Sequence, residues 1–154
     1  MKNLASPFRA DASAKNLLIE IETKGKDFTL CADRYKLKQA VSNILSNALR
    51  YTPTSGKVII ELYKEDGMVC ISFEDSGEGI SPGEREKVFE RFYRTDRGRN
   101  RSDGGSGLGL SVAMQIVKMH GGDIRIEEAR KLTGARVILS IPSMGETERA
   151  GLYA

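Results

Sequence analysis

Strand-like runs come in pairs along this chain, and a short turn joins the members of the first two pairs. Lys24-Gly25-Lys26 and Glu65-Asp66-Gly67 have the composition of such turns. Hairpins make neighbouring strands antiparallel, so the order is not that of a doubly wound parallel fold. The predicted pairs are 17–22 with 27–31, 57–63 with 68–75, and 123–128 with 135–141.

Helical segments separate these pairs. From Asp33, a suitable N-cap, to the stop at Pro53, apolar residues recur at three- and four-residue spacing, which predicts one long helix. A second helix is predicted over 108–119, and a shorter helical piece within 84–93. This order predicts an α+β fold, a two-layer sandwich in which a mixed, mostly antiparallel sheet is covered on one face by about three helices.

Length and composition exclude several classes of protein. A chain of 154 residues, 40% of them apolar, fits one domain with a buried core. Two cysteines and one histidine are too few for a disulfide framework or a four-ligand zinc site, and no apolar run is long enough to cross a membrane. We interpret 15–142 as the folded domain, 1–14 as a leader or linker stub and 143–154 as a tail, and we expect a cytoplasmic location.

The net charge of +3 conceals one strongly basic segment. Between Arg91 and Arg101 the chain carries five arginines and one acid, so the rest of the chain is close to neutral. Such a local concentration favours a local anion site over general binding to nucleic acid. The alternative interpretation is a solvated basic loop.

Two asparagines share one face of the first predicted helix. Asn43 and Asn47 lie four residues apart, with Arg50 and Tyr51 on the same side. Asparagine is a poor helix former, so two in one stripe need a reason. One interpretation is a solvated polar face, and the other is a pair of amides that contact a ligand or a hard cation such as Mg²⁺.

Two glycine-rich segments add further candidates. Asp75-Ser76-Gly77-Glu78-Gly79-Ile80 follows a predicted strand. A ligand could approach the backbone closely at these glycines, and its exocyclic amine could donate a hydrogen bond to the Asp75 carboxylate. Gly104-Gly105-Ser106-Gly107-Leu108-Gly109-Leu110 leads into the second long helix, whose free N–H groups favour phosphate. Neither segment is a Walker A loop or a Rossmann fingerprint.

Taken together, these blocks resemble the ATP-binding catalytic domain of sensor histidine kinases, whose Bergerat fold is shared with gyrase, mismatch-repair and chaperone ATPases. Residues 33–53 resemble the N box of that family, and 75–80 its first glycine box. Val88-Phe89-Glu90-Arg91-Phe92-Tyr93-Arg94 is similar to the F box, and 104–110 to the second glycine box. The resemblance covers 17–142 and implies a lid at about 94–106.

The resemblance implies two cofactors, ATP and Mg²⁺, and a role for each matching residue. Asn47 would ligate Mg²⁺, Asn43 would lie beside the phosphates, and Asp75 would bind the adenine amine. Asn43 and Arg94 are the implied catalytic residues. Further nucleotide contacts are implied for Arg50, Tyr51, Gly77, Gly79, Ile80, Phe92, Arg94, Arg101, Gly105, Ser106, Gly107, Leu108, Gly109 and Leu110.

The resemblance also implies a reaction and its partners. Hydrolytic relatives carry a glutamate that activates water where this chain has Asn43, and an amide cannot act as a general base. We therefore expect transfer of the γ-phosphoryl group to a histidine on a separate dimerisation domain of the parent kinase, with a response regulator downstream. His120 has the context of a helix C-terminus and not of a phosphoacceptor.

Two alternatives stay open at this point. A serine-kinase anti-sigma factor of the same superfamily would have about this length, and a nucleotide-binding scaffold would keep the boxes without the transfer reaction. We expect no partnership with nucleic acid and no direct contact of this domain with a membrane, although the parent sensor is expected to be membrane-anchored.

Overall fold

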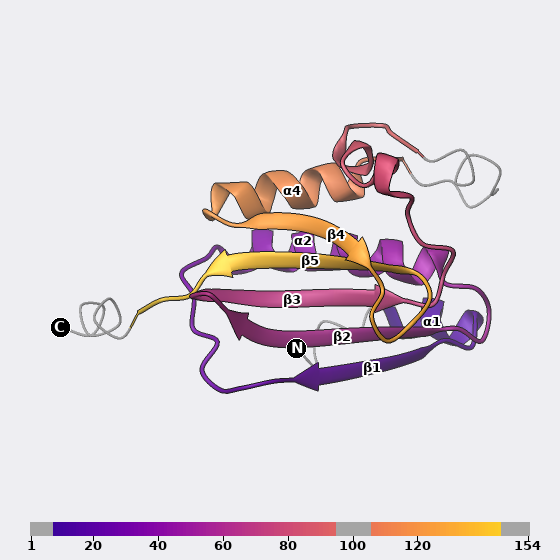
Figure 1. Cartoon of the computed structure of the whole chain (residues 1–154), viewed down its shortest axis with the longest axis horizontal. Coiled ribbons are helices and arrows are strands. Elements are labelled where there is room, and N and C mark those ends of the chain that lie inside the picture. Colours follow the sequence, from indigo (N-terminus) through magenta and orange to yellow (C-terminus); the bar gives the residue numbers. More distant parts are fainter. Residues whose placement is uncertain (1–7, 95–105, 146–154) are drawn as a thin grey trace.

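The computed structural model describes residues 8–94 and 106–145, which form a five-stranded sheet with helices against one face (Figure 1). The strand order across the sheet is β1-β2-β3-β5-β4. The pairs β2–β3, β3–β5 and β5–β4 are antiparallel and β1–β2 is parallel, which confirms the predicted α+β fold with a mixed, mostly antiparallel sheet. In chain order the elements are α1 (Arg9–Ala14), β1 (Leu18–Thr23), α2 (Arg34–Tyr51), β2 (Lys57–Glu65), β3 (Met68–Asp75), η2 (Pro82–Glu84), η3 (Lys87–Phe89), α4 (Gly109–Met119), β4 (Asp123–Glu128) and β5 (Ala135–Pro142).

The predicted hairpin between 17–22 and 27–31 is wrong. β1 pairs in parallel with β2, with Leu18 beside Lys57, and 27–33 contains no strand. Parallel neighbours need a crossover connection, which here runs through α2, and 27–33 leads from the sheet edge into that helix. Leu30 from this segment packs against the core, so packing of a loop accounts for the apolar residues that resemble a strand.

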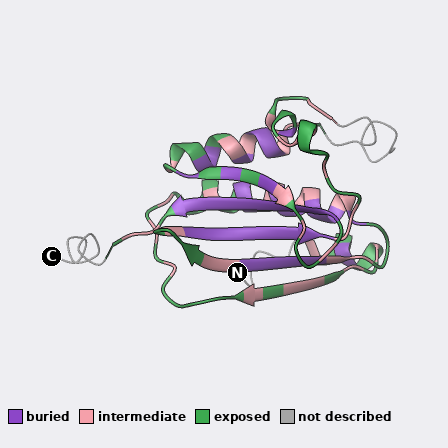
Figure 2. Cartoon of the chain, viewed as in Figure 1, coloured by how far each residue is buried: buried purple, intermediate pink, exposed green. Residues whose placement is uncertain are grey.

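One core lies between the sheet and the helices α2 and α4, which pack against each other. Figure 2 shows that β3 and β5 are buried along nearly their whole length. Ile44 of α2 is fully buried between helix and sheet. The buried stripe of α2 consists of Ala40, Val41, Ile44, Leu45, Ala48 and Leu49, which confirms the predicted spacing.

The helix α2 begins and ends where the sequence predicts. The Asp33 carboxylate accepts hydrogen bonds from the N–H groups of Tyr35 (2.9 Å) and Lys36 (3.1 Å). The bond from Lys36 is the chief reason that the pKa of Asp33 lies below its ordinary value. The last helical residue is Tyr51, two positions before Pro53. Local sequence therefore sets both ends of this helix.

The predicted short helical piece within 84–93 is the single-turn 3₁₀ helix η3, and another such turn, η2, precedes it. Phe92 then takes a left-handed backbone with φ 65°. The N–H group of Phe92 donates to the carbonyl of Gly107 (3.1 Å). The chain thus leaves the helical path in order to pair with the second glycine-rich segment.

The chain N-terminal to β1 packs onto the domain. It contains α1, in which Ala12 is buried, and Phe8 packs against the core. Of the helices within 8–94 and 106–145, none is both long and apolar enough to cross a membrane.

The face of the sheet opposite the helices holds a cluster of charged side chains. Glu61 on β2, which is 5% exposed, lies 2.7 Å from the ammonium of Lys24 and 2.8 Å from that of Lys131. Burial opposes ionisation of Glu61, but the two ammonium groups outweigh it and lower its pKa to about 2. Glu61 also faces the guanidinium of Arg136 at 3.5 Å. This carboxylate therefore stays ionised in the folded protein well into the acid range.

We expect the free energy of unfolding to fall on acidification because of Glu61. Its pKa is about 2 in the folded chain against an ordinary value of 4.5, so its contribution is complete above about pH 4.5 and is lost as the pH falls toward 2. Urea denaturation between pH 7 and 3 measures this, and Glu61→Gln should flatten the dependence. Glu86→Gln, at an exposed position, is the control, and an equal slope in both variants would contradict the assignment.

Candidate functional site

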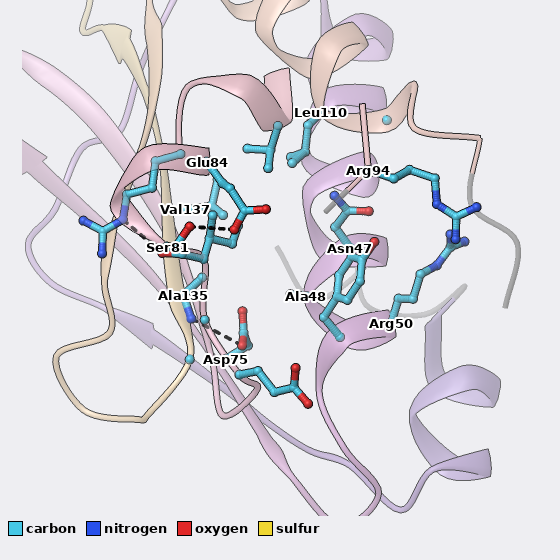
Figure 3. Close-up of a pocket in the computed structure, with 18 of the residues that line it drawn as sticks. Asn47, Ala48, Arg50, Asp75, Ser81, Glu84, Arg94, Leu110, Ala135 and Val137 are labelled. Carbon is cyan, nitrogen blue, oxygen red and sulfur yellow. Dashed lines mark hydrogen bonds between the residues drawn. The ribbon is translucent and has the colours of Figure 1, made fainter. Parts of the chain in front are cut away.

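One pocket of about 820 Å³ lies where the C-terminal half of α2, the end of β3, the start of α4 and the β4–β5 loop meet (Figure 3). Its lining takes in most of the residues singled out from the sequence. Those in the lining are Asn43, Asn47, Arg50, Tyr51, Asp75, Gly79, Ile80, Arg94, Ser106, Gly107, Gly109 and Leu110. Segments far apart in the chain therefore form one cavity.

The α2 face of the pocket carries the predicted polar stripe. Asn43, Asn47 and Arg50 line the cavity at helical spacing, on the side of α2 away from its buried stripe. Figure 3 shows the guanidinium groups of Arg50 and Arg94 pointing toward one another on one side of the pocket. Two neighbouring cations repel, and a polyanion bound by both removes that repulsion. This side of the pocket is therefore suited to phosphate groups.

The Asp75 carboxylate lies on another side of the pocket, beside Ala135 (Figure 3). It is 6% exposed, and its Oδ1 accepts hydrogen bonds from the N–H groups of Gly77 (2.8 Å) and Ala135 (3.4 Å). Burial raises the pKa of Asp75, and these two bonds partly offset that effect. Because both bonds end at Oδ1, the geometry leaves Oδ2 to accept a hydrogen bond from a ligand.

Some of the predicted site residues do not line the pocket. A Cβ on Gly77 would lie 2.7 Å from the carbonyl oxygen of Tyr51, so a glycine there lets the loop pack against the end of α2. Phe92 is 70% exposed. Leu108 immediately precedes α4 and lies outside the lining. Arg101 and Gly105 fall outside the described residues, as does most of the predicted lid.

The second glycine-rich segment brings the start of α4 to the cavity. Gly107 has a left-handed backbone (φ 69°), and a Cβ there would lie 2.9 Å from the carbonyl carbon of Phe92, so this contact requires glycine. Gly109 and Leu110, the first residues of α4, line the pocket. The positive end of the α4 dipole is thus directed at the cavity, which favours an anionic ligand.

Sequence reasoning missed the β4–β5 loop. Thr133, Gly134 and Ala135 line the pocket beside Asp75. The Gly134 N–H donates to the main-chain carbonyl of Asp75 (2.9 Å), and on the other face of the sheet Glu74 Oε1 accepts the N–H groups of Lys131 and Leu132. A single glycine in a hairpin loop is ordinary, so no sequence signal pointed to this contact.

The histidine of the chain lies elsewhere. His120 caps the C-terminus of α4, its Nδ1 lies 2.7 Å from the carbonyl of Ile116, and its Nε2 accepts the N–H of Asp33 (3.0 Å). Both ring nitrogens are engaged by backbone groups when Nδ1 carries the proton. His120 thus joins the end of α4 to the start of α2 and does not line the pocket.

Gly134→Ala should destabilise the fold at the pocket. A Cβ at this position would lie 2.5 Å from the Asp75 carbonyl oxygen and 2.7 Å from the Gly77 nitrogen, so backbone must move, at a cost of about 1–3 kcal/mol. Urea denaturation measures the change. The control is Gly83→Ala, because Gly83 lies between two residues of the pocket lining and a Cβ there meets nothing within 4 Å. Equal stability of the two variants would refute the close contact.

Comparison with known proteins agrees with this geometry. The profile of the family described as histidine kinase-, DNA gyrase B-, and HSP90-like ATPase matches residues 32–144. The signal transduction histidine-protein kinase BaeS of Escherichia coli K12 is 36% identical over 142 residues, which cover 92% of this chain and 30% of that protein. The sensor histidine kinase WalK of Bacillus subtilis 168 is 40% identical over 125 residues, which cover 80% of this chain and 20% of that protein. The chain therefore spans less than a third of the length of these two relatives.

Solved structures show the same fold. The catalytic domain of the histidine kinase ThkA, in a nucleotide-free form, is 30% identical, with a TM-score of 0.79, and covers 94% of this chain and 92% of that one. Full-length ShkA in complex with AMPPNP is 27% identical, with a TM-score of 0.78, and covers 92% of this chain and 28% of that one. ThkA in complex with the response regulator protein TrrA has 29% identity, a TM-score of 0.76 and coverages of 93% and 39%. The chain therefore belongs to the histidine kinase-, DNA gyrase B- and HSP90-like ATPases and, among them, is a catalytic domain of the sensor histidine kinase type.

Proposed function

We propose that this domain binds Mg-ATP in the α2–α4 pocket and donates the γ-phosphoryl group to a histidine on a separate dimerisation domain of a larger sensor kinase. The observation that supports this proposal most directly is the distribution of charge in the cavity, with the Asp75 carboxylate on one side and the guanidinium groups of Arg50 and Arg94 on another. That arrangement matches a base with an exocyclic amine at one end and a polyanion at the other. ShkA, whose structure contains AMPPNP, supports the choice of nucleotide.

In this proposal different residues of the lining bind different parts of the nucleotide. Asp75 Oδ2 would accept the adenine amine, and Arg50, Arg94 and the start of α4 would hold the phosphates. Asn47 offers a neutral amide oxygen, which suits Mg²⁺ because this ion keeps several waters and takes its remaining ligands from substrate phosphates. Within the described residues no cluster of three or more His, Cys, Asp or Glu could hold the ion alone. When bound, Mg²⁺ would supply neutralisation of the phosphate charge.

Transfer, and not hydrolysis, is the reaction that this lining favours. Asn43 lines the cavity on the same face of α2 as Asn47 and Arg50, and its amide cannot take a proton from water. The acidic side chains of the lining other than Asp75 are Glu78, Glu84 and Glu128, which come from the loop after β3, from η2 and from the end of β4, and none of them is on α2. We therefore expect the isolated domain to hydrolyse ATP slowly.

The partners follow from the same proposal. His120 has both ring nitrogens engaged, so the phosphoacceptor histidine would lie outside this domain. ThkA has been solved with a response regulator protein, and we propose a regulator of that class as the downstream partner. The relatives reported above are sensor kinases, so the anti-sigma alternative gains no support from them.

The first test is calorimetric titration of the chain with AMPPNP, with and without Mg²⁺. We expect saturable one-to-one binding that Mg²⁺ strengthens. Binding of AMPPNP with no effect of Mg²⁺ would remove the metal from the proposal. No heat, together with an unchanged melting temperature, would favour the scaffold alternative.

Asp75→Asn should weaken AMPPNP binding by about 100-fold or more, because the new amide would direct a donor at the adenine amine and a buried polar group would lose its partner. The variant keeps the shape of the side chain, so circular dichroism and thermal unfolding should show an intact fold. An affinity close to that of the unchanged chain would remove the adenine assignment from Asp75.

Asn47→Ala should weaken binding of Mg-AMPPNP about tenfold and binding of metal-free AMPPNP much less, because the amide oxygen acts through the ion. Ser42→Ala is the matched control, since Ser42 is on the same helix and does not line the pocket. The measurement is a pair of titrations, one with Mg²⁺ and one with EDTA. Equal losses in the two titrations would refute metal ligation by Asn47.

A further inference from the structure

Lys15 makes an unusual set of contacts for a lysine outside the pocket. Its side chain, in the turn between α1 and β1, donates from Nζ to three main-chain carbonyl oxygens at the C-terminal end of α2. They belong to Arg50 (2.7 Å), Leu49 (3.2 Å) and Thr52 (3.4 Å). The last carbonyls of a helix lack intrahelical partners and carry partial negative charge, so an ammonium with three donors satisfies them.

The carbonyls that Lys15 holds belong to the turn that forms one wall of the pocket. Arg50 and Tyr51 line the cavity, whereas Lys15 does not. The ammonium thus holds the main-chain carbonyl of Arg50, while the guanidinium of the same residue extends toward that of Arg94 on one side of the pocket (Figure 3). A shift of this turn would move the Arg50 side chain and the Tyr51 ring together.

The main chain around Lys15 is itself held by hydrogen bonds. Its carbonyl accepts the N–H of Ser55 (2.9 Å), and the N–H of Leu18 donates to Gly56 (3.0 Å). On the N-terminal side, Leu17 donates its N–H to the carbonyl of Ala12 (2.8 Å), and Ala12 is buried. Figure 1 shows α1 beside the C-terminal end of α2. The segment 8–17 and the last turn of α2 are therefore joined by backbone bonds and by one charged side chain.

We propose that Lys15 is a positioning residue for the nucleotide site: it holds the last turn of α2 so that Arg50 meets the phosphates. A displacement of segment 8–14 would then change nucleotide affinity through Lys15. This inference rests on the proposed function. The effect is larger at Arg50 than at Asp75, because the Asp75 carboxylate is held by the N–H group of Ala135 on β5 as well as by that of Gly77.

The test compares the binding of AMPPNP and of adenosine to Lys15→Met, which keeps the length of the side chain and removes its charge. We expect AMPPNP to bind about tenfold more weakly and adenosine to bind with an affinity within about twofold of the unchanged chain. Lys15→Arg restores a cation and should recover most of the loss. Lys38→Met is the control, since Lys38 is an exposed lysine on α2 outside the pocket lining.

A double-mutant cycle separates positioning from general stability. If Lys15 acts through Arg50, the effects of Lys15→Met and Arg50→Met on AMPPNP affinity are less than additive, whatever each does to the melting temperature. Additive effects, or equal weakening toward adenosine and AMPPNP, overturn the inference. Should Lys15→Met not fold, the same cycle is run with Lys15→Gln, to which the same outcomes apply. Failure of the unchanged chain to bind AMPPNP overturns the proposed function itself and is recognised before any variant is compared.

Discussion

Burying the carboxylate of Asp75 costs free energy, and the surrounding backbone is arranged to offset that cost. Its Oδ1 accepts the N–H groups of Gly77 and Ala135, and its main-chain carbonyl accepts the N–H of Gly134. The neighbouring Glu74 points to the opposite face of the sheet and accepts the N–H groups of Lys131 and Leu132. Two consecutive acidic residues at the end of β3 therefore hold the β4–β5 loop from both faces, and that loop completes the pocket.

The pocket also depends on α2, which packs into the core with one side and lines the pocket with the other. Its buried stripe, centred on Ile44 and Leu45, packs against the sheet and α4, so the rotation of the helix about its axis is fixed by apolar packing. Asn43, Asn47 and Arg50 lie on the side of α2 away from that stripe, so the same packing directs them at the cavity. The precision of the polar site is thus a consequence of core packing.

The residues of the pocket lining could be predicted from the sequence wherever a local pattern places them. The face shared by Asn43, Asn47 and Arg50 follows from helical spacing alone, and Gly107 follows from the glycine-rich pattern before α4. Long-range contacts were not predictable in the same way. Gly134 reaches Asp75 only because β3 pairs with β5, and the parallel pairing of β1 with β2 overrides a turn sequence that favours a hairpin. The network around Glu61 also depends on Lys24 and Lys131, which are far apart in the chain.

The contacts of Lys15 show that a cation near a pocket can serve the fold and not the ligand. Counted by residue type, Lys15, Arg50 and Arg94 would all be cations available to a phosphate. Lys15 instead satisfies the carbonyls of Leu49, Arg50 and Thr52, so its charge stabilises the negative end of the α2 dipole. The positive end of the α4 dipole is directed at the cavity from the other side. The positive end of α4 thus faces the pocket, whereas the negative end of α2 is neutralised by a lysine outside it. The proposed phosphate site therefore has Arg50, and not Lys15, as its cation at this end of α2.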